Sequence, residues 1–294
     1  MAPEDPDAGR DMTWMRPDPG YLPTKIDTSK PNIARVYDAR LGGKDNFAVD
    51  RAVAEHMSKV FPDGGKAARN NRALLGRAVR YMAAQGISQF LDLGSGLPTV
   101  QNTHQIAQAA NPGARVVYVD NDPMVLSHGR ALLAENASTT VVTADLREPG
   151  KIMALPEITG FLDLARPVGL ILNAVLHYVL DEEDPYGIVD HYKELLPPGS
   201  YLLITQFCNE SDASGELVTV LQHAFGQCQP RSRGEITRFF DGFDLVPPGV
   251  VHLVQWRPEE PVSQPLGFTE MLGLSGVARK PLPLLIHSVQ YPRT

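Results

Sequence analysis

The chain has 294 residues, with 27 Lys and Arg against 34 Asp and Glu, and its formal charge of −7 argues against a nucleic-acid binder that works through a basic face. Its longest nearly apolar run, 168–176, is far shorter than the roughly 20 residues that span a bilayer, and the N-terminus lacks a signal-peptide pattern, so we expect a cytoplasmic protein without a transmembrane helix. Cys208 and Cys228 have no metal-ligand spacing around them, so the sequence predicts neither a metal site nor a disulfide framework.

The N-terminal third divides into two parts. Residues 1–31 hold six prolines among Asp, Gly and Thr, a composition typical of a disordered or loosely ordered arm. In 32–86 the apolar spacing predicts helices, and the pair Gly42 and Gly43 predicts a turn between two of them. We interpret 32–86 as an N-terminal helical cap, which closes with a long helix over 66–85.

From residue 87 onward, short β-branched runs alternate with helical patterns. The predicted strands are 88–93, 115–120, 139–143, 168–174 and 201–206. This alternation predicts right-handed βαβ units and a parallel sheet with helices on both faces. The helices predicted near its end are 216–225 and 234–240, and the apolar runs that follow are 250–256, 274–278 and 284–289. We expect the last strands to pair antiparallel at one edge of the sheet.

The first predicted strand ends in a glycine-rich turn. Ligands of open parallel sheets bind beyond the carboxyl ends of the strands, and Gly94 and Gly96 would let a ligand approach the backbone there. A dinucleotide fingerprint would place a third glycine where Thr99 stands. The carboxylate of Asp92 would repel a pyrophosphate and attract a ligand that carries an ammonium and a sulfonium. The turn therefore favours a ligand that is cationic at this end.

Two further acids follow the next two strands. Asp120 ends the second strand, where a carboxylate can accept both ribose hydroxyl protons of a nucleoside. Its alternative role, capping the next helix, is met better by Asn121 or Asp122. After the third strand, Asp145 is placed to accept a proton from an adenine amino group while Leu146 packs on the ring. The alternative for Asp145 is a loop aspartate that caps a turn.

This order of motifs resembles the class I S-adenosylmethionine-dependent methyltransferases. More narrowly, four segments resemble the S-adenosyl methyltransferase family: NIARVYDARLGGKDN at 32–46, QFLDLGSGLPTVQNT at 89–103, VVYVDNDP at 116–123 and FFDGFDLVPPGVV at 239–251. The resemblance implies an α/β, Rossmann-like class I methyltransferase fold: a mostly parallel seven-stranded sheet, helices on both faces and an N-terminal helical cap. It also implies S-adenosylmethionine as the cofactor and S-adenosylhomocysteine as the product, within a binding domain over 87–294.

Carried onto this chain, the resemblance assigns cofactor contacts to the ends of four strands. The expected cofactor-binding residues are Asp92, Gly94, Ser95, Gly96, Asp120, Asn121, Asp145, Leu146, Asn173 and Ala174. The last two end the fourth strand, where such enzymes line the methyl-transfer channel. This chain has neither an acidic nor an Asn-Pro-Pro motif there, which weakens any inference toward an amino-group or nucleobase acceptor.

Methyl transfer from a sulfonium is an in-line displacement, so alignment in a site without water is the main task. For a hydroxyl or ammonium acceptor, His177 is the candidate general base, because its ordinary pKa near 6.5 suits that role; the alternative is a structural histidine. Tyr37 is the second candidate catalytic residue. If the cap closes as a lid, Tyr37 or Arg35 would approach the cofactor carboxylate, and Lys44 or Asp45 the acceptor. The alternative is a plain helix-turn-helix.

Three functions follow from these observations. The first is a methyltransferase that uses S-adenosylmethionine and acts on an unidentified small-molecule acceptor. The second is a non-catalytic or regulatory protein that binds S-adenosylmethionine or S-adenosylhomocysteine. The third, an NAD-dependent oxidoreductase, is disfavoured by Thr99 and Asp92. The acceptor and the oligomeric state stay open.

Overall fold

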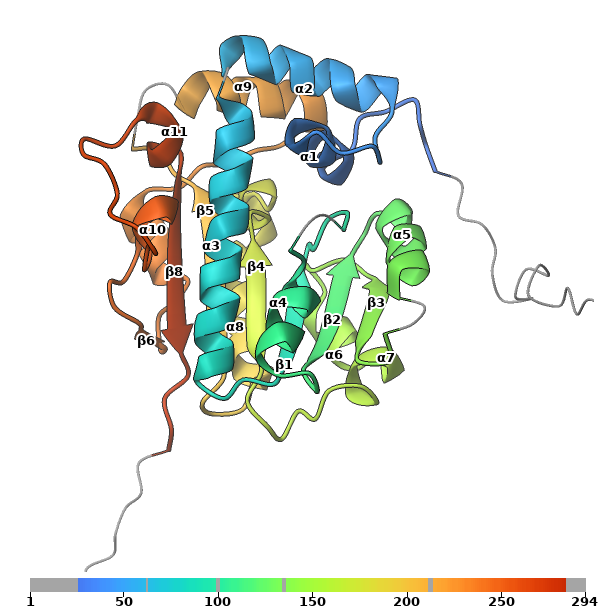
Figure 1. The fold of residues 1–294 in the computed structure, drawn as a ribbon, viewed down its shortest axis with the longest axis vertical. Coiled ribbons are helices and arrows are strands. Elements are labelled where there is room, and N and C mark those ends of the chain that lie inside the picture. Colours follow the sequence, from blue (N-terminus) through green and yellow to red (C-terminus); the bar gives the residue numbers. More distant parts are fainter. Residues whose placement is uncertain (1–25, 62, 99–100, 134–135, 211–213, 284–294) are drawn as a thin grey trace, which may run out of the picture.

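The computed structural model describes residues 26–61, 63–98, 101–133, 136–210 and 214–283 (Figure 1). Most of the predicted arm, Thr99 and the apolar run 284–289 lie outside these residues. Among the described helices, none combines the length and the apolar composition needed to cross a bilayer.

Five parallel strands form the part of the sheet that the alternating pattern predicts. They are β1 (Gln89–Leu93), β2 (Arg115–Asp120), β3 (Thr139–Thr143), β4 (Gly169–Asn173) and β5 (Tyr201–Phe207). They pair in the order β3-β2-β1-β4-β5. The strand order therefore reverses at β1, and in open parallel sheets such a switch point opens a crevice at the carboxyl ends of the strands.

An antiparallel edge completes the sheet, as the sequence predicts. The strand β8 (Gly273–Arg279) pairs with β5, and its other edge pairs with β6 (Asp244–Leu245) and β7 (Val251–His252). The described sheet thus has eight strands where seven were expected, because the seventh position is divided in two. Pro247 and Pro248 lie between the two pieces and lack the N–H that a continuous ladder needs. Within the predicted run 250–256, the residues after β7 form the short helix η4 (Leu253–Gln255).

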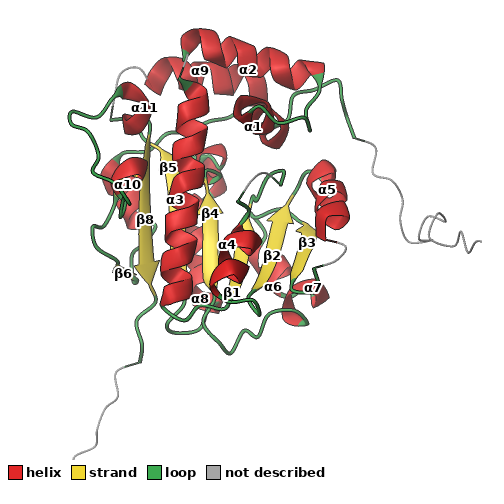
Figure 2. Ribbon diagram, viewed as in Figure 1, coloured by secondary structure: helices red, strands yellow, loops and turns green. Residues whose placement is uncertain are grey.

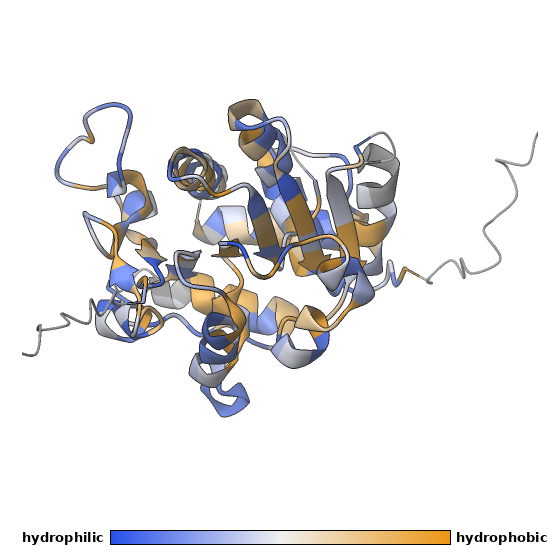
Figure 3. Cartoon of the chain, turned by 90° about the horizontal axis from the view of Figure 1, so that it is seen from below, coloured by the Kyte–Doolittle hydropathy of each residue, from blue (hydrophilic) through white to orange (hydrophobic). Residues whose placement is uncertain are grey.

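Helices cover both faces of the sheet (Figures 2 and 3). The elements on the two faces and at the β3 edge are α3 (Gly64–Ala84), α4 (Thr103–Ala110), α5 (Pro123–Leu133), α6 (Pro149–Met153), α7 (Pro156–Thr159), α8 (Pro185–Leu195) and α10 (Arg233–Arg238). The strands alternate between two cores: Phe90 of β1 packs with α3 and α4, whereas Leu91 and Leu93 pack with α6, α7 and α8. The apolar strand runs of the sequence are buried in this way, and α6 and α7 are helices that the sequence did not predict.

A helical cap lies over the carboxyl ends of the parallel strands (Figure 1). It contains α1 (Ile33–Leu41) and α2 (Ala48–Val60), and α9 (Ser214–Phe225) packs with them in one hydrophobic cluster; α11 (Phe268–Met271) follows later in the chain. The structure therefore adds α9 to the cap predicted over 32–86. The long helix α3 also joins the two layers, since its residues Leu74 to Met82 pack on the sheet.

A buried ion pair holds the cap together. The Nε atom of Arg35 lies 3.1 Å from Oδ2 of Asp50, and both side chains are almost fully buried. The two oxygens of Asp50 also accept hydrogen bonds from the backbone N–H groups of Asn32 and Phe47, at 2.9 and 2.8 Å. Asp50 therefore joins the start of α1 to the start of α2, and Arg35 is engaged in the cap.

Candidate active site

A cavity of about 260 Å³ lies between the cap and the carboxyl ends of the strands. Its walls come from the loops after β1, β2, β3 and β4, from β5, and from α1, α3 and α9. The predicted site residues that line it are Tyr37, Gly94, Ser95, Gly96, Asp120, Asn121, Asp145, Leu146, Asn173, Ala174 and His177. Segments far apart in the sequence thus meet at one place, whereas the predicted cofactor contact Asp92 does not line this cavity.

Asp92 lies behind the glycine turn, in a smaller pocket of about 30 Å³. Its Oδ2 accepts a hydrogen bond of 2.7 Å from the hydroxyl of Thr103, the first residue of α4. Burial raises the pKa of Asp92 to about 6, although Thr103 and Arg72 oppose the shift. In this arrangement Asp92 anchors the start of α4, so the predicted direct attraction of a cationic ligand would have to act through the glycine turn.

The two glycines of the turn differ in the space that surrounds them. Both have φ of +66°, in the left-handed region that favours glycine. A Cβ on Gly94 would lie 2.4 Å from Cγ2 of Val175, whereas a Cβ on Gly96 would meet no atom within 4 Å among the described residues. Gly94 is therefore required by packing, and Gly96 leaves open space beside the cavity. Between them, the buried hydroxyl of Ser95 has no hydrogen-bond partner in the described part of the chain.

Asp120 connects the end of β2 to the glycine turn. Its Oδ2 accepts from the N–H of Gly96 at 2.8 Å and its Oδ1 from the N–H of Asp122 at 2.9 Å. Burial raises the pKa of Asp120, while these backbone donors lower it. The cap of α5 is instead Asp122, whose Oδ1 accepts from the N–H of Met124 at 2.8 Å. The alternative role of Asp120 as that helix cap is therefore not realised.

Asp145 has a basic partner in its own loop. Its Oδ1 accepts from the backbone N–H of Arg147 at 3.0 Å, and its Oδ2 pairs with Nη2 of Arg147 at 2.6 Å. The guanidinium lowers the pKa of Asp145 and also pairs with Glu183. Asp145 thus caps its turn, which was the alternative role, and at the same time lines the cavity beside Leu146.

A polar network crosses the cavity floor and reaches the cap. The hydroxyl of Thr205 on β5 lies 3.0 Å from Oδ1 of both Asn173 and Asn71. Nδ2 of Asn71 lies 3.5 Å from the hydroxyl of Tyr37, which donates to the carbonyl of Ala68 at 3.1 Å. Thr205 carries no signal in the sequence because it lies within a strand; the parallel register that pairs it with Asn173 brings it to the site.

His177 lies in η2 (Leu176–Tyr178) and is 1% exposed. Its ring packs between the rings of Tyr178 and Phe207, with centroids 4.3 and 4.2 Å away. Burial, with a smaller effect of the Arg231 guanidinium, lowers the pKa of His177 to about 3. The imidazole is therefore neutral at pH 7, and the argument from an ordinary pKa near 6.5 does not apply in this environment.

Several cavity residues were not singled out from the sequence. Arg40 lies on the same face of α1 as Val36 and Tyr37, so helical spacing alone could have identified it. The α9 residues Leu217, Leu221 and Phe225 line the cavity from a helix far along the chain. The structure does not bring Arg35, Lys44 or Asp45 to the cavity, in contrast to the lid hypothesis.

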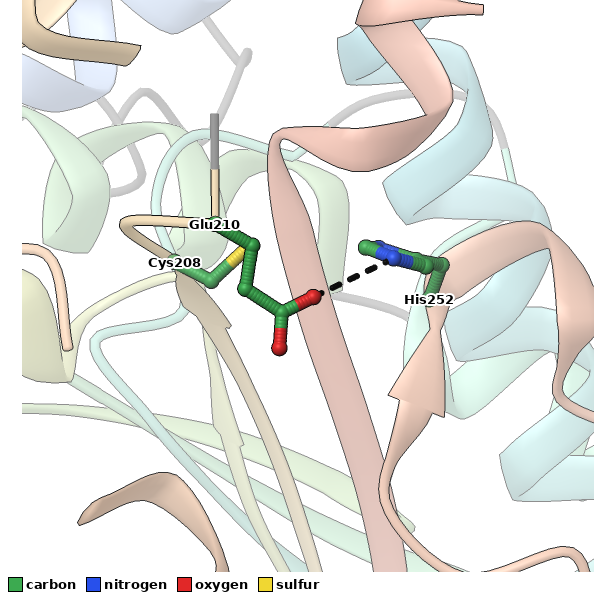
Figure 4. Close-up of side chains that lie close together, drawn as sticks. All are labelled: Cys208, Glu210 and His252. Carbon is green, nitrogen blue, oxygen red and sulfur yellow. Dashed lines mark ion pairs between the residues drawn. The ribbon is translucent and has the colours of Figure 1, made fainter. Parts of the chain in front are cut away.

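A second group of polar side chains lies close together (Figure 4), and none of its members lines the cavity. Ligand atoms of Cys208, Glu210 and His252 all lie within 4.8 Å of one another. The thiol of Cys208 donates to the carbonyl of Met271, and burial raises the pKa of this thiol. Arg233 holds Glu210 by two hydrogen bonds of 2.9 and 2.8 Å. These protein partners and the charge of Arg233 oppose a cation there.

Comparison with known proteins identifies the family. A family model described as S-adenosyl methyltransferase matches residues 19–281. The chain belongs to the S-adenosyl methyltransferase family. A proposed methyltransferase from Thermobifida fusca is 48% identical, with a TM-score of 0.85 over 90% of this chain and 100% of that one. A DUF574 family protein from Streptomyces avermitilis is 39% identical, with a TM-score of 0.84 over 87% of this chain and 100% of that one. The predicted family and fold class are confirmed.

More distant relatives carry a different name. Carboxy-S-adenosyl-L-methionine synthase from Vibrio parahaemolyticus is 27% identical over 220 residues, which cover 71% of this chain and 80% of that protein. The Vibrio campbellii protein of the same name is 26% identical over 218 residues, with 71% and 80% covered.

The cofactor of this family of methyltransferases is S-adenosylmethionine. Three observations indicate that the cavity fits this cofactor. They are the open space at Gly96, the buried hydroxyl of Ser95 without a partner among the described residues, and the carboxylate of Asp120 at the strand end. These groups offer a close backbone approach, a hydroxyl donor and a charged acceptor to one ligand.

Alanine substitutions at Gly94 and Gly96 should distinguish an effect on protein stability from an effect on S-adenosylhomocysteine binding. We expect Gly94→Ala to lower the free energy of unfolding by about 2 kcal/mol or more, because the left-handed backbone strain adds to the collision with Val175. Gly96→Ala carries only the strain, about 1 to 2 kcal/mol, yet its methyl would enter the space beside the cavity and weaken S-adenosylhomocysteine binding about tenfold. Urea denaturation and calorimetry measure both effects. Equal binding by Gly96→Ala and wild type would contradict this role of Gly96.

Proposed function

We propose that this methyltransferase transfers the methyl group of S-adenosylmethionine to a small molecule that binds in the same cavity. The observation that carries the proposal is the two-sided lining of this cavity. One side consists of strand ends with glycines and carboxylates, and the other is largely apolar. The apolar side comprises Met57, Phe61, Leu217, Leu221, Phe225 and Leu272. A cavity shared by these two surfaces can hold a cofactor and an acceptor together.

The cofactor contacts remain those assigned by the resemblance. We propose that Asp120 accepts the ribose hydroxyls, with Asn121 beside it, and that Asp145 and Leu146 contact the adenine. The turn of Gly94, Ser95 and Gly96 would hold the methionine end. Asn173 and Ala174 would line the channel toward the acceptor.

Bound S-adenosylmethionine supplies an electrophilic methyl group on a sulfonium. The protein's own contribution is to align the acceptor and to exclude water, which is consistent with a cavity covered by α1 and α9. Tyr37 is held by Ala68 and Asn71, so its hydroxyl is oriented. His177 stays a candidate proton acceptor by position, although a pKa of about 3 makes it a weak base.

The decisive experiment combines calorimetry with an activity screen. We expect S-adenosylhomocysteine to bind and NADH not to bind. Incubation with S-adenosylmethionine and a panel of small hydroxyl, amine, thiol and carboxyl compounds should release S-adenosylhomocysteine with at least one of them. Binding without turnover on any compound would favour the non-catalytic alternative, and preferential NADH binding would contradict the assignment.

The Vibrio relatives suggest a second candidate reaction. Their name describes the synthesis of a carboxylated form of S-adenosylmethionine. Similarity over 71% of this chain makes a cofactor-modifying reaction worth testing. The test mixture must then also contain a carboxylic acid that can give up CO2, because adding a carboxyl group to the methyl carbon takes CO2 from such a donor and releases a proton. Mass spectrometry separates the two candidates, since this reaction yields a carboxylated cofactor and methyl transfer yields S-adenosylhomocysteine.

The low pKa of His177 predicts a pH effect on stability. Below pH 6.5 the unfolded chain binds a proton at this histidine that the folded protein does not bind until about pH 3. This contribution to stability is therefore complete above pH 6.5 and is lost as the pH falls. We expect wild type to lose about 1.4 kcal/mol per pH unit relative to His177→Gln between pH 6 and 4. Urea denaturation at several pH values measures it, with the exposed His56→Gln as control. A pH-independent difference would contradict the assigned pKa.

A further inference from the structure

Arg40 presents a cationic side chain to the cavity without an anionic partner in the described part of the chain. Its Nη1 lies 3.7 Å from Sδ of Met57, and its guanidinium carbon lies 5.4 Å from the ring centroid of Phe61. Its Nη2 is buried and has no hydrogen-bond partner among the described residues. Burial lowers the pKa of Arg40, because it removes the charged guanidinium from water.

The backbone makes room for this guanidinium. A Cβ on Gly64, the first residue of α3, would lie 1.2 Å from Nη2 of Arg40. The side chain therefore occupies space that only a glycine leaves open. This close fit fixes the guanidinium at the side of the cavity where α1, α2 and α3 meet.

Two fully buried arginines show what the fold provides for a guanidinium that is removed from water. Arg35 pairs with Asp50 inside the cap. Arg231 donates to the carbonyls of Leu176 and Val179 and pairs with Asp181. The Arg40 side chain is only partly buried, and its guanidinium has no such partner in the described part of the chain, so a ligand oxyanion could form charge-assisted hydrogen bonds there.

We propose that Arg40 forms an anion-binding subsite for the methyl acceptor, and that the acceptor carries a carboxylate on an apolar, preferably aromatic, body. The planar guanidinium matches a carboxylate. The surrounding aromatic lining, Phe61, Tyr178, Phe207 and Phe225, matches the body. This inference rests on the proposed function, since it names the substrate class of that site.

The cofactor's own carboxylate is the other source of such an anion. We assign Arg40 to the acceptor because its contacts, Met57 and Phe61, belong to the apolar side of the cavity. A different arginine, Arg72, lines both the main cavity and the pocket behind the glycine turn, where it lies with Ser95 and Gly96. The cofactor's methionine end is assigned to that turn.

The test uses pairs of probes that differ only in charge. The complex of the full chain with S-adenosylhomocysteine is titrated by calorimetry with benzoate, phenylacetate and 3-phenylpropionate, and with the corresponding amides. We expect at least one carboxylate to bind tenfold or more tightly than its amide. Arg40→Gln should abolish this preference. Arg40→Lys, which keeps the charge without the planar fork, should retain part of it. Arg69→Gln, an exposed arginine on α3, should retain all of it.

The outcomes separate the inference from the proposed function. The inference is overturned if no carboxylate is preferred over its amide or if the preference survives in Arg40→Gln. It is also overturned if Arg40→Gln lowers S-adenosylhomocysteine affinity tenfold, because Arg40 would then hold the cofactor's carboxylate. In these cases the proposed function stands. If wild type does not bind S-adenosylhomocysteine, the proposed function fails, and the inference fails with it.

Discussion

Asp120→Ala is expected to weaken the binding of S-adenosylhomocysteine at least tenfold. If the carboxylate accepts both ribose hydroxyls, the change removes two charge-assisted hydrogen bonds that contribute roughly 1.5 to 3 kcal/mol each. The same carboxylate receives the N–H of Gly96, so the change also loosens the glycine turn. Calorimetry with the purified variant measures the affinity.

Two further variants make this prediction specific. Asp120→Asn should bind with intermediate affinity, because its amide oxygen still accepts but carries no full charge. Asp244→Ala, an exposed acid on β6, should bind as tightly as wild type. If Asp120→Ala folds normally and binds S-adenosylhomocysteine as tightly as wild type, the ribose assignment is wrong.

Asp50→Ala is expected to lower the free energy of unfolding of the cap by about 3 to 5 kcal/mol. The change leaves the buried guanidinium of Arg35 without its carboxylate and removes the acceptor for two backbone N–H groups. Because α1 and α2 line the cavity, the affinity for S-adenosylhomocysteine should fall as well. Urea denaturation measures the stability, and hydrogen exchange locates the loss in α1 and α2.

The matched control is Glu55→Ala on the same helix. Glu55 is exposed, and in the part of the chain that the structure describes it pairs with Lys59 one turn later, so its removal should change the free energy of unfolding by about 0.5 kcal/mol or less. Equal effects of Asp50→Ala and Glu55→Ala would show that the buried pair does not hold the cap.

Local sequence patterns determined the main architecture. The β-branched runs and the helices between them predicted β1 to β5, because strand burial and helix amphipathicity are properties of short segments. The acids and glycines at the strand ends predicted where the cavity lies, since the carboxyl ends of parallel strands meet at one edge. Most of the expected site residues, including Gly96, Asp120 and Asp145, line one cavity for this reason.

Tertiary structure alone decided the environment of each side chain. Asp92 lies behind the turn and His177 has a pKa of about 3, because burial depends on segments that pack from elsewhere in the chain. Thr205 reaches the site through strand register, and α9 reaches it through the hydrophobic cluster that it shares with α1 and α2. That Nη2 of Arg40 has no hydrogen-bond partner among the described residues is likewise invisible in the sequence, because it is a property of the three-dimensional neighbourhood.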